Sequence, residues 1–404
     1  MTVINAAATT GSDVSRARVA IAIIFAVHGA VAGTFATRIP WLADHLDTDP
    51  GGLGVALLFV AIGAMAAMPF AGKITHRLDV RTATRILMVL WCLSLILPPL
   101  APNLTVFAFT LFLYGATSGL ADVAMNAQGV AVEQRAGRSI MSGLHGMWSV
   151  GGLAAAGGGA LAATVGLTAP VHFAVVAPVL AVIAAVASGR LLHVQAPDRD
   201  GPAFALPSRP VLLIALVAFA AVFAEGASMD WAALYLTDVT HASAGIAAMA
   251  YGGFAATMAM SRLVGDRVVD RLGPVRAVRY GGVAATGGAV LVTVARTPSL
   301  AIAGFALIGV GVAVVVPLAF TAAGNAGTRP AHQIAGVATI AYGAGLIAPA
   351  SIGGIAHATS LSTSFLVVAV LAAMVVVGAG TLRRRDADSR SPGPAARPVL
   401  TPPP

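Results

Sequence analysis

The sequence has few charged residues. Only 10% of its 404 residues are Asp, Glu, Lys or Arg, whereas 58% are hydrophobic and the mean hydropathy is +0.87. A soluble globular domain carries roughly 25% charged residues, because its surface faces water. This chain could not cover a water-soluble surface of its size. The composition therefore excludes a soluble protein and predicts an integral membrane protein.

Cysteine and lysine are almost absent. The single cysteine, Cys92, excludes an intramolecular disulfide and a multi-cysteine metal site. The histidines are too dispersed for a metal site, and no phosphate-binding Walker loop is present. We therefore expect no enzyme activity, no metal and no cofactor. Lys73 is the only lysine, and the 23 arginines are scattered between apolar stretches, so the net charge of +8 does not predict nucleic acid as a partner.

Long apolar stretches fill most of the chain. A helix crosses the ~30 Å hydrocarbon layer of a bilayer in about 20 residues. Charges and turn residues divide the sequence into twelve candidate spans of about this length. They are residues 19–41, 53–71, 83–101, 104–131, 140–163, 168–189, 210–236, 243–264, 276–296, 299–324, 332–356 and 361–382.

The distribution of basic residues predicts an orientation. With the N-terminus inside, 22 of the 24 basic residues fall on the inner side, and only Arg38 and Arg296 fall outside. Because basic residues concentrate in cytoplasmic loops, this alternation predicts twelve spans with both termini cytoplasmic. The excess of arginine over lysine is typical of GC-rich bacterial genomes, so we expect a multi-pass protein of the bacterial cytoplasmic membrane.

The chain divides into two halves at a polar, proline-rich stretch. Residues 1–18 are predicted to be a cytoplasmic tail that is not a cleaved signal. Residues 19–189 and 210–382 are predicted to form two six-helix bundles, and 190–209 a cytoplasmic linker. Residues 383–404 have no apolar periodicity and are predicted to be a disordered tail. Nothing in the sequence calls for an oligomer, so we expect a monomer.

An internal repeat relates the halves. A shift of 194 residues places Trp41 on Tyr235 at the outer ends of spans one and seven, and Arg77 on Arg271 in the loops after spans two and eight. These two loops resemble the G-x-x-x-D-R-x-G-R-R signature of the major facilitator superfamily. The matching residues or positions are Gly72, Arg77 and Arg81 in the first loop, and Asp266, Asp270, Arg271, Gly273 and Arg276 in the second.

Neither copy of the signature is complete. His76 replaces the aspartate and Asp79 the second glycine of the first copy, and Asp266 replaces the first glycine of the second. The resemblance implies an all-α integral membrane fold of twelve transmembrane helices in two pseudo-symmetric six-helix bundles. It also implies transport by alternating access. A carboxylate such as Asp270 at an inner helix end could hold cationic groups of a neighbouring helix and latch an inner gate.

Two carboxylates are candidates for proton coupling. Asp122 lies one helical turn before Asn126, an arrangement that resembles span four of fucose permease relatives, where it serves proton coupling. A static pair is the alternative. Glu225 is expected near the bilayer midplane, beside Gly226, and an ionisable group at that depth indicates function.

Other polar residues are candidates for the substrate cavity and an outer gate. Arg38 breaks the inner clustering of basic residues, so we expect it to pair with Asp230 at the equivalent end of span seven. Helix packing or interfacial anchoring is the alternative for the cavity candidates. Those candidates are His28, Asn126, Gln128, His145, Trp148 and Trp231.

Residues 37–41, Asp122 with Asn126, and residues 225–231 resemble the fucose-permease-like branch that includes the rhizopine-locus (MosC-like) membrane proteins. The resemblance implies proton-coupled symport of a small polar, sugar-like solute. Proton-antiport efflux of a drug or metabolite is the alternative. Span five lacks the glycine–proline pair usual in exporters, although span eleven contains Pro349. Small molecules, protons and lipid are thus the expected partners.

Overall fold

The computed structural model describes residues 11–137, 140–194, 207–326 and 330–383, and within these ranges the regular structure is entirely helical. The helices are α1 (Gly11–Ala36), α2 (Ile39–His45), α3 (Pro50–Leu78), α4 (Val80–Ser94), α5 (Leu104–Ala136), α6 (Met141–Thr164), α7 (Ala169–Ser188), α8 (Arg209–Asp238), α9 (Ala244–Leu272), α10 (Pro274–Val294), α11 (Pro298–Val312), α12 (Val315–Gly324), α13 (Pro330–Ala358) and α14 (Leu361–Gly378), with 3-10 turns at Pro98–Leu100 and Ala379–Leu382.

Eleven segments of the described chain are long and apolar enough to cross a membrane. The remaining predicted span is α6, in which seven of 24 residues are glycine, a residue that lowers mean hydropathy. This helix packs between α1 and α9. On α7, by contrast, a stripe of exposed valines including Val175, Val179 and Val186 faces outward, as a lipid-facing surface requires. The all-α membrane fold is confirmed.

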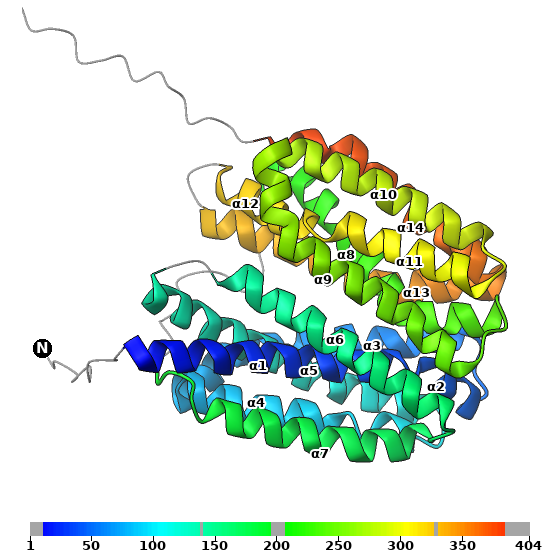
Figure 1. Cartoon of the computed structure of the whole chain (residues 1–404), viewed down its shortest axis with the longest axis horizontal. Coiled ribbons are helices and arrows are strands. Elements are labelled where there is room, and N and C mark those ends of the chain that lie inside the picture. The colour runs from blue at the N-terminus through cyan, green and yellow to red at the C-terminus, as the bar shows by residue number, and fades with distance from the viewer. Residues whose placement is uncertain (1–10, 138–139, 195–206, 327–329, 384–404) are drawn as a thin grey trace, which may run out of the picture.

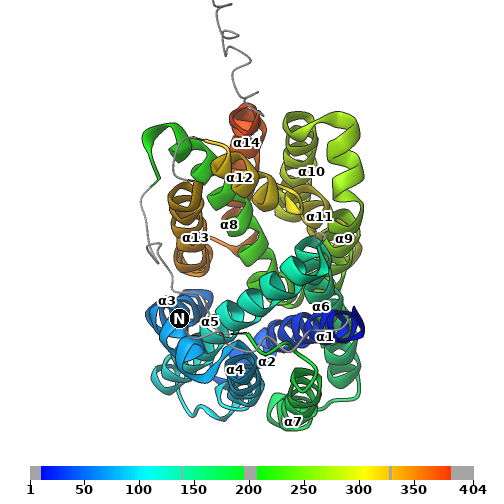
Figure 2. The same ribbon diagram turned by 90° about the vertical axis from the view of Figure 1, so that its left-hand side faces the viewer.

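The helices form two bundles, α1–α7 and α8–α14, which lie one above the other in Figures 1 and 2. Their internal packing is alike. In the first bundle α3 packs on α5 and α4 on α7, and in the second α9 packs on α11 and α10 on α14. The helices α3 and α9 have 29 residues each and both ends are related by a shift of 194 residues. The repeat seen in the sequence is therefore a repeat of helices.

Equivalent tight turns follow α3 and α9. Asp79 and Gly273 occupy the same position in the repeat and both have positive φ, 60° and 76°. The side chain of Asp79 compensates for the strain of this backbone conformation. The Asp79 carboxylate accepts hydrogen bonds from the backbone N–H groups of Arg81 (2.9 Å) and Thr82 (3.2 Å) at the start of α4. An aspartate can thus stand where the superfamily signature has glycine.

Two predicted boundaries are wrong. Span 19–41 is interrupted, since α1 ends at Ala36 and a separate helix begins at Ile39, where Pro40 has no N–H to continue the first. The expected N-terminal tail 1–18 is helical from Gly11 onward. Span 299–324 is confirmed as one candidate membrane span, Pro298–Gly324, whose helix is interrupted at residues 313–314 between α11 and α12. Residues 195–206 and 384–404, in the predicted linker and tail, lie outside the described residues.

The two bundles meet tightly at one face of the molecule. We call the face with the turns after α3 and α9 the basic face, and the other the opposite face. Near the opposite face, a Cβ on Gly54 of α3 would lie 3.0 Å from Cα of Gly353 of α13. A Cβ on Gly245 of α9 would lie 3.5 Å from Cβ of Thr164 of α6. Such close approach is possible only between small residues, and it closes the opposite face.

Toward the basic face α3 and α13 move apart. Between α3 and α13 a cavity of about 130 Å³ is lined by Ala61, Ala64, Met65, Met68, Thr339 and Tyr342. Tyr342 is 48% exposed, and His145 on α6 is exposed as well. The molecule is therefore closed at the opposite face and open toward the basic face.

Candidate functional site

Three acidic side chains at membrane depth are partly exposed in the space between the bundles: Asp122 on α5, and Glu225 and Asp230 on α8. Two of them interact electrostatically with the opposite bundle. Asp122 does so with Tyr342 of α13, and Asp230 with Tyr114 of α5. A ligand between the bundles would therefore meet carboxylates from both.

The predicted Asp122–Asn126 pair forms within α5. The Asn126 side-chain amide donates to the Asp122 carboxylate (3.1 Å) and to the Asp122 backbone carbonyl (2.9 Å). Gln128 does not join them. It is fully buried, and its amide donates to the carbonyl of Leu192 (3.0 Å) after α7. Two positions along a helix turn a side chain by about 200°, so the prediction of Gln128 as a cavity residue is wrong.

Glu225 pairs with a residue that the sequence analysis missed. The Arg262 guanidinium of α9 donates to both Glu225 oxygens (3.2 and 3.4 Å) and to the Ser149 hydroxyl of α6 (3.3 Å). The Arg262 and Glu225 side chains are 15% and 22% exposed. Through its bond to Ser149, Arg262 joins the two bundles, and its ion pair with Glu225 is partly buried.

Arg262 was assigned to the cytoplasmic end of span 243–264 because it is basic. The helix α9 continues to Leu272, which places Arg262 ten residues before its end, about 15 Å at 1.5 Å per residue. Leu263 and Val264 follow Arg262 within the predicted span, so their apolar character could have indicated that Arg262 lies inside the span and not at its end.

Aromatic residues support one wall of the site. The Trp148 indole N–H donates to Nδ1 of His28 (3.0 Å), and the His28 ring stacks on Trp91 at 5.2 Å. Trp91 in turn packs against Tyr114 at 4.2 Å. Trp148 is partly exposed, whereas His28 is only 6% exposed. His28 therefore orients Trp148 from behind and does not itself face the cavity.

The remaining cavity candidates separate. His145 is exposed, lies edge-on to Phe25 at 5.3 Å and interacts electrostatically with Arg262, so it lines the opening toward the basic face. Trp231 is fully buried, and its ring lies 3.1 Å from where a Cβ on Gly353 would be. It packs in the contact between the bundles, so the prediction of Trp231 as a cavity residue is wrong for this conformation.

The expected Arg38–Asp230 pair does not form. Arg38 is 3% exposed and donates to the carbonyl of Leu167, in the connection between α6 and α7 of its own bundle. The break between α1 and α2 turns Arg38 toward this loop and away from α8. Asp230 has no hydrogen bond or ion pair within the described part of the chain.

The signature residues lie at the basic face. Arg81 donates to the carbonyl of Gly189 (2.6 Å) and contacts His193 (2.8 Å), which ties α4 to the end of α7. Asp270 is exposed and has no ion pair among the residues that the structure describes, so the expected latch is not made in this conformation. Nothing is described for the Asp266 side chain. The other signature positions are at or near the surface: Gly72, Arg77, Arg271, Gly273 and Arg276.

An ion pair joins the bundles at the opposite face. The Asp49 carboxylate lies 2.8 Å from Nδ1 of His357, at the end of α13. Asp49 also caps α3 by accepting from the Gly52 N–H (2.7 Å). This hydrogen bond, and secondarily the nearby His357, lower the pKa of the Asp49 carboxyl below its usual value. Asp49 thus stays charged in weak acid.

The Asp49→Asn variant keeps a capping side chain but loses the charge, so it is expected to weaken the contact with His357 and to speed opening of the opposite face by about twofold, since exposed ion pairs are weak. Transport rates of wild type and Asp49→Asn, measured at neutral pH, check this. Equal rates in the two proteins would contradict the role of the pair.

No group of three or more His, Cys, Asp or Glu side chains in the described ranges could hold a metal ion. The arrangement instead offers carboxylates, one paired arginine and aromatic rings around a space between two bundles. Hydrogen bonding, charge and stacking are thus the interactions available to a bound solute.

Comparison with known proteins gives concordant results. Residues 21–349 match the Major Facilitator Superfamily. The chain is 36% identical to the uncharacterized transporter y4wD of Sinorhizobium fredii over 90% of this chain and 97% of that one. It is 31% identical to the membrane protein MosC of Rhizobium meliloti over 88% of both chains. The resemblance to MosC-like proteins expected from the sequence is confirmed.

Solved structures show the same fold. The nucleoside transporter NupG, as its D323A mutant, has a TM-score of 0.72 and 12% identity, with 91% of this chain and all of that chain covered. The fucose:proton symporter FucP of E. coli has a TM-score of 0.59 and 14% identity, with 91% and 98% covered. From the match over most of its length and from the two-bundle architecture, the chain belongs to the major facilitator superfamily of membrane transporters.

Proposed function

We propose that this protein moves a small polar solute across a bacterial cytoplasmic membrane as a monomer, coupled to protons, by alternating access of its two bundles. The basic face is then cytoplasmic, as the distribution of arginine predicts. The observation that carries this proposal is the set of partly exposed carboxylates, Asp122, Glu225 and Asp230, in a space that is closed at one face and open toward the other.

Proton coupling needs a carboxylate that is ionised in one conformation and protonated in another. Asp122 suits this task. It faces Tyr342 beside the cavity that opens toward the basic face, and its only hydrogen-bond donor within the described residues is the neutral amide of Asn126. A static Asp122–Asn126 pair would not need this exposure. Glu225, by contrast, has Arg262 as its counter-ion.

Symport of a sugar-like solute remains the first candidate direction. Proton-antiport efflux is the second, and one observation favours it: the close contact of the bundles at the opposite face includes the carbonyl of Pro349 in α13, against Gly54. The proline that exporters usually carry in span five is absent from α6 and stands in α13 instead.

The Asp122→Asn variant tests the coupling. In proteoliposomes, proton flux is recorded while sugars, polyols and amino sugars are added in turn. We expect Asp122→Asn to lower proton-driven accumulation by about 100-fold while exchange of the same solute across the membrane continues. Asp44→Asn, which changes an exposed acid of α2 at the opposite face, is the matched control and should behave as wild type. Unchanged proton flux in Asp122→Asn would overturn the assignment.

A further inference from the structure

One carboxylate in the space between the bundles has no partner that the proposed function explains. Asp230 is partly exposed on α8 and makes no hydrogen bond or ion pair within the described residues. It lies five positions beyond Glu225 on α8, toward the closed opposite face. Asp230 is therefore at the deep, closed end of the space that opens to the basic face. A carboxylate left there without a partner indicates a site for something that the chain itself does not supply.

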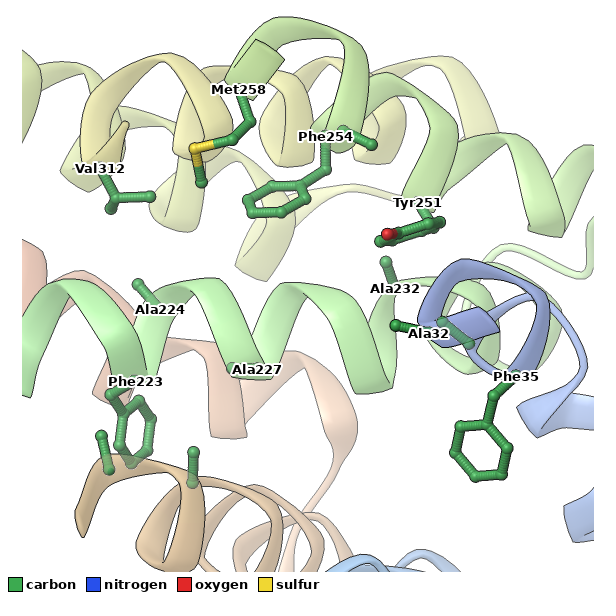
Figure 3. Close-up of a cluster of buried hydrophobic side chains, with 14 of the residues drawn as sticks. Ala32, Phe35, Phe223, Ala224, Ala227, Ala232, Tyr251, Phe254, Met258 and Val312 are labelled. Atoms are coloured by element: carbon green, nitrogen blue, oxygen red, sulfur yellow. The ribbon is translucent and has the colours of Figure 1, made fainter. Parts of the chain in front are cut away.

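Two tyrosines from different bundles lie near Asp230. Tyr114 of α5 and Tyr251 of α9 both interact with it electrostatically. Their side chains are 3% and 1% exposed, so their rings are held in place. Tyr251 lies between the bundles, against Gly33 and Gly152 of the first bundle, and beside Ala232 and Ala32 in Figure 3.

The Tyr251 hydroxyl is an independent sign of a missing ligand. It is buried and has no hydrogen-bond partner in the described structure. Buried hydroxyls nearly always have a partner, because losing water without compensation is unfavourable. This hydroxyl interacts electrostatically with both Glu225 and Asp230. A ligand group bound to Asp230 would therefore lie near the Tyr251 hydroxyl.

The charges around this space do not balance. Among the described residues Arg262 is the cation that lies there, and it is already paired with Glu225. His145, near Arg262, is exposed toward the basic face. Asp122 and Asp230 have no cation at ion-pair distance in the described ranges. The space therefore attracts positive charge and disfavours an anion.

We propose, on the basis of the transport function proposed above, that the solute carries an ammonium group, which binds to Asp230 beside the Tyr251 hydroxyl. The carboxylate compensates the charge, and the hydroxyl, which has no hydrogen-bond partner in the described structure, can accept a hydrogen bond from an ammonium N–H. Because Tyr114 and Tyr251 come from different bundles and both interact with Asp230, the bound ammonium lies where the two bundles meet. The solute thus bridges the bundles at the end of the space that must open for transport.

The first test measures the charge preference of the space without knowledge of the solute. Ser118 lies one turn beyond Tyr114 on α5 and is partly exposed, so Ser118→Cys in a Cys92→Ser background places a thiol there. The rates of thiol labelling are measured with cationic 2-aminoethyl methanethiosulfonate and with anionic 2-sulfonatoethyl methanethiosulfonate. Each rate is divided by the rate at which the same reagent reacts with free mercaptoethanol. We expect the cation to react about 10-fold faster than the anion, and Asp230→Asn to reduce the difference, with the remainder due to Asp122 one turn beyond Ser118. Asp44→Asn should preserve it.

The second test uses three sugars of one ring that differ in charge: glucosamine, glucose and glucuronate. At millimolar concentration glucosamine is expected to slow labelling of Ser118→Cys and to be the one of the three that moves with protons in proteoliposomes. Asp230→Asn should weaken its effect by about 10-fold. Equal rates for the two labelling reagents, or stronger protection by glucose than by glucosamine, would overturn the ammonium site.

The outcomes separate the two proposals. If glucose is transported with protons and glucosamine is not, the ammonium site is wrong while proton-coupled transport stands. If glucosamine protects the thiol but neither the sugars nor the broader panel produces flux, proton-coupled transport is wrong, and Asp230 belongs to a binding site without transport.

Discussion

Oxidation of a Thr164→Cys/Gly245→Cys variant, made in a Cys92→Ser background, is expected to lower transport by about 100-fold, and a reductant is expected to restore it. A Cβ on Gly245 would lie 3.5 Å from Cβ of Thr164. Disulfides join Cβ atoms about 3.5–4.5 Å apart, so the two cysteines can form one without movement of the backbone. This bond would tie α6 to α9 and hold the opposite face closed. Solute transport before and after oxidation is the measurement.

The single-cysteine variants are the controls. Thr164→Cys should transport normally with or without oxidant. Gly245→Cys alone adds a side chain whose Cβ would clash with the Thr164 hydroxyl, so it reports the steric effect without the bond. Removal of Cys92, which is fully buried, leaves the introduced thiols as the only reactive pair. If the oxidised double variant transports as fast as the reduced one, the bundles do not separate at this contact.

The sequence predicted those features that depend on local pattern. Apolar runs of about 20 residues locate helices, because every span must hide its backbone from lipid. The shift of 194 residues located the repeat, and the structure reproduces it at Asp79 and Gly273, which share a positive φ. Asp122 and Asn126 were paired correctly, since a helix sets four-residue neighbours on one face.

Contacts between distant segments were not predictable in the same way. Arg38 was expected to meet Asp230 because both lie near equivalent helix ends, but a two-residue break after α1 directs Arg38 to Leu167. Tyr251 is an unremarkable aromatic residue in the sequence and contacts both bundles only because Gly33 and Gly152 leave room for it. Such contacts depend on how two rigid bundles are placed, and no periodicity within one helix contains that information.

The same limit explains the assignment of Arg262 as an orientation signal. Because arginine is abundant at the predicted cytoplasmic ends of the spans, the presence of Arg262 near such an end does not indicate a functional role. Its role follows from where α8, α9 and α6 meet, since Glu225 and Ser149 are 37 and 113 residues away in the chain. Of the groups around the site, Arg262 is the residue whose substitution should have the largest effect.

Replacing Arg262 with methionine is expected to lower transport by about 100-fold and the free energy of unfolding by about 3 kcal/mol, because Glu225 would remain partly buried without its cation. Glu225→Arg alone should be as damaging, since two guanidinium groups would then face each other. The charge-swapped Glu225→Arg/Arg262→Glu variant restores opposite charges and should recover much of the stability. Thermal unfolding in detergent and solute transport measure the two effects separately.

The Ser149→Ala variant tests the hydrogen bond between the bundles independently of the Glu225–Arg262 ion pair. It removes the acceptor of the 3.3 Å bond from Arg262 but leaves the bond to Glu225 intact. Stability should fall by only about 1 kcal/mol, as for one ordinary hydrogen bond. Transport should change more than stability, because this bond crosses the surface along which the bundles move. If Arg262→Met unfolds at the wild-type temperature and transports normally, the ion pair is a surface contact and the transport mechanism does not depend on it.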